Sequence, residues 1–162
     1  MKTMTTCLWF DDQAEEAARF YTAVFPNSRI GAITRYSAEV SKVAGRPEGS
    51  VMTVTFDLDG NPFMGLNGGP LFRFSEAISF IVKCDTQEQI DYFWDRLTAD
   101  GGQPGQCGWL KDRFGVSWQI TPANMDEIMS RGDAEGQKRM MAELMKMTKL
   151  DMNALNRAYE GK

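Results

Sequence analysis

The chain contains two similar segments, at residues 12–24 and 85–97. A shift of 73 positions aligns them and pairs acidic or aromatic residues in both: Asp12 with Asp85, Glu15 with Glu88, Phe20 with Phe93, and Tyr21 with Trp94. Each segment opens with Asp-x-x-Glu, which is typical of a helix start, because the Asp oxygen can cap free amides and the Glu reaches back. Each also follows a short apolar run that predicts a strand. The repeat predicts two copies of one supersecondary unit in a duplicated sheet, with a site between the copies.

A second pair of motifs agrees with the duplication. Asp57 is followed three residues later by Gly60, and Asp112 by Gly115, and each motif precedes a strand-like run. Asp at the first position and Gly at the fourth favour a type I turn. Each half of the sequence therefore predicts a hairpin built around such a turn.

Composition excludes several classes of protein. The 162 residues suffice for one domain or two small modules, and the net charge of −4 argues against nucleic acid as a partner. No apolar run approaches the length of a membrane span, and the apolar run near the start is too short for a signal peptide. Three cysteines, widely spaced and odd in number, indicate reduced thiols and a cytoplasmic location.

The sequence contains no histidine. This excludes Ser-His and Cys-His nucleophile pairs, imidazole acid-base catalysis and the commonest metal ligand. Any catalysis must use carboxylates, Lys, Tyr, Cys, amides or water.

Hydrophobic patterning predicts the elements of each unit. The first unit is expected to contain a strand, a helix, a strand, a long loop and two further strands, at residues 4–10, 13–25, 28–36, 37–49, 50–58 and 62–67. The second is expected to contain a strand, a helix, a short strand or loop, and a hairpin, at residues 77–84, 86–99, 103–106, 107–110 and 116–121.

Helix-forming residues dominate from Pro122 onward. Three helices are predicted, at residues 124–131, at 134–147 with Asp133 as cap, and at 152–159 with Asp151 as cap. Five methionines lie between positions 140 and 152. This tail is interpreted as cover for a sheet edge or as a subunit contact; the alternative is an adaptable binding surface of flexible thioethers.

Two βαβββ units in one chain resemble the vicinal oxygen chelate superfamily, the fold of glyoxalases and extradiol dioxygenases. The local sequence is closer to its PhnB-like branch, also labelled 3-demethylubiquinone-9 3-methyltransferase-like. Four stretches carry the resemblance, within a region that covers roughly residues 3–122: residues 8–11 with 14–21, 25–28, 59–70 and 107–119.

The resemblance implies a cup formed by a curled sheet, in which active members of the superfamily usually hold a divalent metal. The family's ligand spacing maps onto Thr6, Met64, Ser79 and Gln119, and a looser register gives Leu66, which shares the face of Met64. Two hydroxyls, a thioether and an amide make a poor divalent site, because His or carboxylate ligands are missing. The sequence therefore predicts no metal and no cofactor.

A methyltransferase should show a glycine-rich loop that leads from a strand into a helix, and neither 68–69 nor 101–102 does so. Cys7 and Cys107 are interpreted as core thiols. The segment 111–113 is either a solvated turn or a cation and a base at a site mouth.

Gln119 is the best polar candidate, and Trp109 could stack on a planar ligand. Period-two alternation predicts that Gln119 faces the cup with two hydroxyl residues, while two apolar residues pack under a helix: Ser117 and Thr121 on the first face, Trp118 and Ile120 on the second.

The predicted fold is α+β, with two βαβββ modules at 1–70 and 76–122 forming a glyoxalase-like domain (1–122) around a cup-shaped sheet, and a helical extension at 123–162. The predicted function is binding of an unidentified small molecule in the cup by a homodimer without a normal metal site. The proposed binding residues are Thr6, Met64, Leu66, Ser79, Trp109 and Gln119. The alternative is a superfamily enzyme, of lyase, isomerase or dioxygenase type, that acts on an unknown small substrate.

Overall fold

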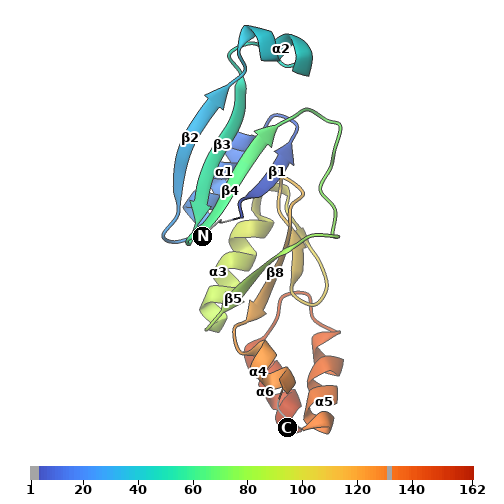
Figure 1. Ribbon diagram of the computed structural model, residues 1–162. Helices are drawn as coiled ribbons and strands as arrows, with labels where there is room; N and C mark the ends of the chain where they lie inside the picture. Colours follow the sequence, from blue (N-terminus) through green and yellow to red (C-terminus); the bar gives the residue numbers. More distant parts are fainter. Residues whose placement is uncertain (1–3, 131–132) are drawn as a thin grey trace. The chain divides into compact units, whose positions relative to one another are not determined.

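The computed structural model describes residues 4–130 and 133–162. It divides into two compact units, Met1–Phe74 and Ser75–Lys162. Each unit contains one four-stranded sheet with a helix packed on it (Figure 1). The α+β class and the repeated βαβββ topology predicted from the sequence are confirmed, and the C-terminal helices belong to the second unit rather than standing apart.

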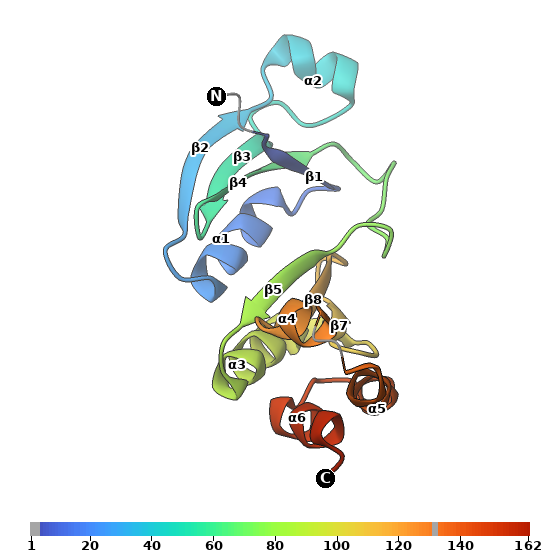
Figure 2. The same ribbon diagram turned by 60° about the horizontal axis from the view of Figure 1, so that its bottom comes forward.

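The first unit consists of β1 (Thr6–Phe10), α1 (Ala14–Val24), β2 (Arg29–Arg35), α2 (Ala38–Ala44), β3 (Val51–Leu58) and β4 (Asn61–Asn67). The strand order is β1-β4-β3-β2, with β1 parallel to β4 and the other neighbours antiparallel. Helix α1 lies across one face of this sheet (Figure 2).

Alternation along the strands decides which side chains meet α1. Phe56 and Phe63 are cross-strand partners whose rings stack 5.3 Å apart, and Tyr21 of α1 stacks on Phe56. Gly65 permits the close approach of the helix, because a Cβ at this position would lie only 3.0 Å from the Cβ of Ala14. The core of the first unit is thus an aromatic layer between one sheet and one helix.

The second unit repeats the arrangement with β5 (Phe80–Cys84), α3 (Gln87–Thr98), the 3₁₀ turn η1 (Ala99–Gly101), β6 (Gln103–Pro104), β7 (Trp109–Lys111) and β8 (Ser117–Pro122). The order is β5-β8-β7-β6, and β5 runs parallel to β8. Trp118 and Ile120 are buried and Gln119 is half-buried, which confirms the predicted alternation of β8.

The two predicted turns differ in the structure. The hairpin β3–β4 turns at Asp59 and Gly60, which have φ of 48° and 82°, so it is a two-residue Asp-Gly turn of the kind preferred between twisted strands. Asp57 accepts a hydrogen bond from Gly60 N but is not the first residue of a type I turn. In the second unit, the Gly115 amide donates to Asp112 O over 2.9 Å, as the type I prediction requires.

The helix caps also differ from the prediction. Helix α1 begins after Gln13, and its first amide, Ala14 N, donates to Asn67 Oδ1 of β4 over 2.8 Å. Helix α3 is capped by Thr86, whose hydroxyl accepts from Gln89 N. The predicted caps Asp12 and Asp85 are therefore wrong: the helices start one residue later, and in the first unit the cap comes from a distant strand.

The predicted 37–49 loop contains helix α2. Ser37 caps it by accepting from Val40 N, and Gly45 ends it in the left-handed conformation. None of its residues is buried, and its seven residues are fewer than the roughly 10–12 by which a helix is usually recognised in a sequence.

The C-terminal segment forms α4 (Met125–Ser130), α5 (Ala134–Leu144) and α6 (Met152–Glu160). The predicted caps are confirmed: Asp133 accepts from Gly136 N, and Asp151 accepts from Ala154 N. Position 131, where the first of these helices was predicted to end, lies outside the described residues. The described helices include none long and apolar enough to cross a membrane.

These helices enclose a small core of their own, made of Ile128, Met140, Leu144, Leu150 and Leu155. The segment after α5 joins this core to the sheet unit, since Cys107 N donates to Met147 O and Gly108 N donates to Thr148 O. The side chain of Gln87 in α3 donates to Leu150 O and accepts from Met152 N. The tail is thus fixed to the second unit at two places.

Candidate functional site

Each sheet has a second face, opposite its helix, which we call the helix-free face. On the second sheet this face carries Trp109, which is paired with Gln119 across β7 and β8. Gln119 Nε2 donates to Ser79 Oγ over 2.9 Å. The structure therefore brings together three of the residues predicted from the sequence: an aromatic ring, an amide and a hydroxyl.

On the first sheet the helix-free face carries Met64 and Leu66, as predicted. Their in-register partners on β1 are Cys7 and Trp9. Thr6 pairs with Phe63, which packs toward α1, so Thr6 lies on the opposite face from Met64. Thr6, which the family's ligand spacing gave as a site residue together with Met64, therefore does not lie on this face.

A difference in connection length explains this error. Three residues separate β1 from α1, whereas two separate β5 from α3. Counting the same number of residues back from each helix therefore reaches positions in β1 and β5 that differ by one residue. A shift of one residue places a side chain on the other face of a strand. The residues missed are Cys7 and Trp9. The parallel pairing to β4 would have identified them had the register been known.

Trp9 is held firmly at the end of its strand. Its indole Nε1 donates to Gly69 O over 2.9 Å, and its ring contacts Phe72 edge-on. Cys7 is exposed and lies two residues before it on the same face. On β1 and β4 the helix-free face of the first sheet is thus mainly apolar, with a thiol and a thioether as its soft groups, whereas β3 places Thr53 and Thr55 on it beside Leu66 and Met64.

A pocket of about 170 Å³ opens at the β6–β7 end of the second sheet. Its lining consists of Glu76, Gln103, Pro104, Gly105, Trp109, Leu110, Lys111 and Ser117. Lys111 Nζ and Glu76 Oε1 form an ion pair of 2.5 Å, and their hydrogen bond lowers the pKa of Glu76. Sequence reasoning left Lys111 open between a turn and a site mouth; in the structure it lines the pocket.

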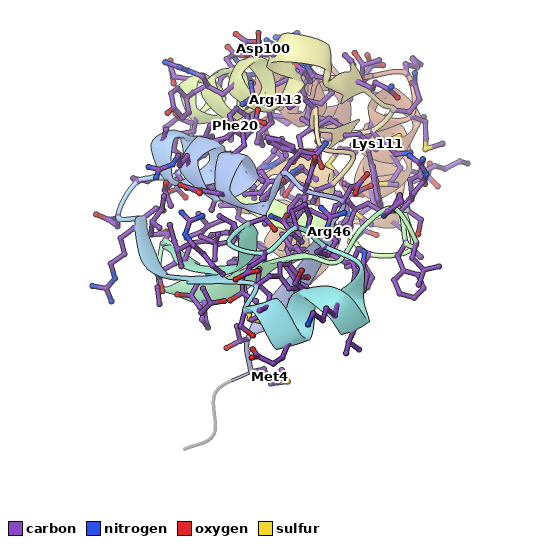
Figure 3. All side chains as sticks on the ribbon, turned by 90° about the horizontal axis from the view of Figure 1, so that it is seen from above. Met4, Phe20, Arg46, Asp100, Lys111 and Arg113 are labelled. Carbon is purple, nitrogen blue, oxygen red and sulfur yellow. The ribbon has the colours of Figure 1, made fainter. Side chains whose placement is uncertain are left out.

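The turn beside this pocket is built around a buried carboxylate. Asp112 accepts from Phe114 N and Val116 N, and its second oxygen accepts from the indole of Trp118 over 2.8 Å. The next residue, Arg113, pairs with the carboxylate of Asp100 over 3.2 Å, and both residues are labelled in Figure 3. Asp112 therefore supports the turn and the core, and it is not placed to act as a base.

The thiols of Cys84 and Cys7 are not activated. Burial raises the pKa of Cys84 to about 11, with a further contribution from the charge of Asp85. Partial desolvation also raises the pKa of Cys7. Because the thiolate is the reactive form, a raised pKa argues against a nucleophilic role for Cys7 or Cys84.

The residues at the superfamily's ligand positions do not fit a divalent metal. In the first sheet the mapped positions are Thr6 and Met64, and Thr6 lies on the opposite face, where Cys7 takes its place beside Met64; the second sheet presents a hydroxyl and an amide at Ser79 and Gln119. Among the described residues, no three His, Cys, Asp or Glu side chains group as a metal site would require. Hard divalent ions prefer carboxylate oxygens, and zinc and other transition metals are commonly held by imidazole, and these positions supply neither.

Comparison with known proteins agrees with this fold. The sequence model of the 3-demethylubiquinone-9 3-methyltransferase family matches residues 2–121. The chain belongs to this family. A PhnB protein from Bacillus cereus with the same family description is 37% identical, over 75% of this chain and 100% of that one, with a TM-score of 0.66. No protein of curated function matches the chain.

More distant structures share the fold. Protein PA1353 from Pseudomonas aeruginosa is 17% identical over 75% of this chain and 98% of its own, with a TM-score of 0.61. The fosfomycin resistance protein FosX from Mesorhizobium loti is 16% identical over 80% and 98% of the two chains, with a TM-score of 0.55. These two likenesses show the shared fold alone. The family model and the 37% identical PhnB protein confirm the PhnB-like family predicted from the sequence.

Proposed function

We propose that this chain binds a small molecule with a flat apolar part on the helix-free face of its second sheet, without a divalent metal centre. The observation that carries the proposal is the grouping of Trp109, Gln119 and Ser79 on that face. A half-buried indole supplies a flat surface for stacking. The amide and the hydroxyl, fixed by their mutual hydrogen bond, supply polar groups that orient a ligand.

The rigidity of this group supports binding rather than packing alone. Trp109 and Gln119 stand on neighbouring strands, so the backbone ladder fixes their separation. The strand beneath them is anchored by buried Trp118 and Ile120 on the other face. A site held by regular strands loses little conformational freedom when a ligand binds.

The methyltransferase description of the family finds no support in the glycines of this chain. Gly68 and Gly69 follow β4 and lead into an irregular segment, and Gly101 and Gly102 lead from α3 toward β6. A nucleotide-like methyl donor is usually held by a glycine-rich turn from a strand into a helix. We derive no methyl transfer from this site.

The indole N–H signals of the four tryptophans provide a direct test. Benzamide, phenol and indole, which are flat and uncharged, are titrated into ¹⁵N-labelled protein. We expect the Trp109 signal to move, while the signals of buried Trp94 and Trp118 stay in place. Absence of any Trp109 shift with all three probes, at millimolar concentration, would overturn the proposal.

A pair of variants sharpens the test. Gln119→Leu removes the amide and should weaken probe binding while leaving the melting temperature within a few degrees, because it also removes a polar group that needs a partner. Thr121→Val, on the same strand and face, is the matched control and should bind the probes as the parent does. Equal weakening in both variants would contradict a role specific to Gln119.

A further inference from the structure

Ser117 has an unusual environment. The side chain is 2% exposed, and within the described part of the chain its buried hydroxyl has no hydrogen-bond partner. A buried hydroxyl without a partner is costly, and most such groups in proteins are satisfied. Ser117 lies in the wall of the 170 Å³ pocket, which makes an external partner the natural complement of this hydroxyl.

Lys111 stands directly opposite Ser117 on the neighbouring strand. Side chains at such positions lie close together on one face of a sheet. The pocket wall therefore combines a cation and an unpaired hydroxyl, while the ring of Trp109 lies two residues away on the same strand and face. A cation, a hydroxyl donor and a flat ring together match a flat molecule that carries an anionic group.

The carboxylate of Glu76, which pairs with Lys111, can be displaced by another carboxylate. Lys111 stands on β7 with its side chain 32% exposed, whereas Glu76 is 63% exposed and lies in a turn before β5. An ion pair whose carboxylate is largely exposed contributes little to stability and is exchanged at small cost. A carboxylate from outside can therefore replace that of Glu76 at Lys111.

We propose that this pocket binds a small monocarboxylate. The ligand carboxylate takes the place of Glu76 at Lys111 Nζ and accepts a hydrogen bond from the Ser117 hydroxyl, and its flat apolar body lies against Trp109. This inference rests on the proposed binding function and adds the chemical class of the ligand. An amine ligand would instead need Glu76 as the fixed partner, but Glu76 is the more exposed and less regularly held of the pair.

Benzoate is the probe, compared with its neutral analogue benzamide and with benzylamine. Affinities are measured from the Trp109 indole shift and by calorimetry on the whole chain. We expect benzoate to bind at least about fivefold more tightly than benzamide, and benzylamine to bind no better than benzamide. Benzamide binding at Trp109 tests the proposed function, whereas the preference for benzoate tests this inference, so the two can fail separately.

Variants test each contact. Lys111→Met should reduce benzoate affinity to the level of benzamide, Ser117→Ala should reduce it about fivefold, and Glu76→Gln should raise it about threefold by freeing the lysine. The matched controls are on the same face of the same sheet: Lys83→Met, which removes a lysine paired with Asp126, and Thr121→Val, which removes a hydroxyl. Both controls should bind benzoate within about twofold of the parent.

Two results would overturn the inference. One is equal binding of benzoate and benzamide by the parent chain, including binding of neither. The other is a benzoate affinity that Lys111→Met and Ser117→Ala leave unchanged while both variants keep the parent's melting temperature. A variant that loses its cooperative melt is replaced by Lys111→Gln or Ser117→Gly, to which the same expectations apply.

Discussion

The two sheets share one topology but are stabilised by different means. In the first unit β2 and β3 have seven and eight residues, whereas their counterparts β6 and β7 have two and three. The second unit compensates with its C-terminal helices and with a buried carboxylate that joins a turn to the core. The comparison teaches that a repeated βαβββ topology fixes strand order and leaves the source of stability open.

Equivalent positions show the same contrast. When the parallel pair β1–β4 of the first unit is matched to the parallel pair β5–β8 of the second, Phe63 corresponds to Trp118 and Phe10 to Cys84. Phe63 contributes only its ring to the core, while Trp118 also donates its indole N–H to Asp112. On the helix-free faces, Met64 corresponds to Gln119, so at this position the first sheet carries an apolar side chain and the second a polar one.

The largest effect is expected at Trp118. Replacing it with Ala should cost about 3–5 kcal/mol of unfolding free energy as a core truncation. Phe63→Ala should cost less, because no buried carboxylate loses a donor there. Urea unfolding of both variants checks the order. Trp118→Phe keeps an aromatic ring and isolates the hydrogen bond, which should be worth about 1.5–3 kcal/mol because its acceptor is charged. A larger loss in Phe63→Ala than in Trp118→Ala would contradict this contrast between the sheets.

The helix caps give the second comparison. Asn67 is 4% exposed, accepts from Ala14 N and donates to Val51 O, so Asn67→Ala should cost about 2–4 kcal/mol by leaving both groups unpaired. Thr86→Ala removes a local cap at the start of α3 and should cost about 1 kcal/mol. Equal losses in urea unfolding would mean that the long-range cap is no stronger than the local one.

The third comparison is alkaline stability. The folded-state pKa of Cys84 is about 11, above the ordinary thiol value of 9.0. The folded state disfavours the thiolate, so the protein keeps its full free energy of unfolding below pH 9, where Cys84 is a neutral thiol in both states. As the pH rises toward 11 and beyond, the free energy of unfolding falls by up to about 2–3 kcal/mol, because only the unfolded state ionises readily. Cys84→Ala should show a shallower fall of unfolding free energy between pH 9 and 11 than the parent. Parallel curves would remove Cys84 as the cause.

The smallest effect is expected from metal removal. Neither sheet presents carboxylate or imidazole donors at its paired ligand positions, so purified protein should contain well under one divalent ion per chain. Incubation with EDTA should leave the melting temperature unchanged. Elemental analysis near one zinc, nickel, iron or manganese per chain would show that the donor argument fails.

Much of the fold could be predicted because each strand and main helix carries its own periodic signal. The β8 alternation is an example, since Trp118, Gln119 and Ile120 already show which face is buried. Helix α2 was missed because it has only seven residues, although Ser37 and Gly45 are suitable cap residues at its ends. Its Gly- and Pro-containing surroundings favour a loop when only local sequence is considered.

The site could be predicted only in part. Ser79, Trp109 and Gln119 share one face, but Thr6 does not share the face of Met64, because the connection before α1 is one residue longer. Nothing in the local sequence reveals that length until the strand ends are known. The cap from Asn67 and the unpaired hydroxyl of Ser117 likewise depend on residues far apart in the chain.

The double hydrogen bond of Gln87 has a consequence for how the chain is made. It joins the start of α3 to Leu150 and Met152, more than 60 positions later. On the ribosome the first unit can close as soon as β4 has emerged, whereas these contacts of the second unit must wait until Met152 has been synthesised. Contacts of such long sequence separation form slowly. The second unit is therefore the later half to mature, and a chain that stops before Leu150 would leave it incomplete.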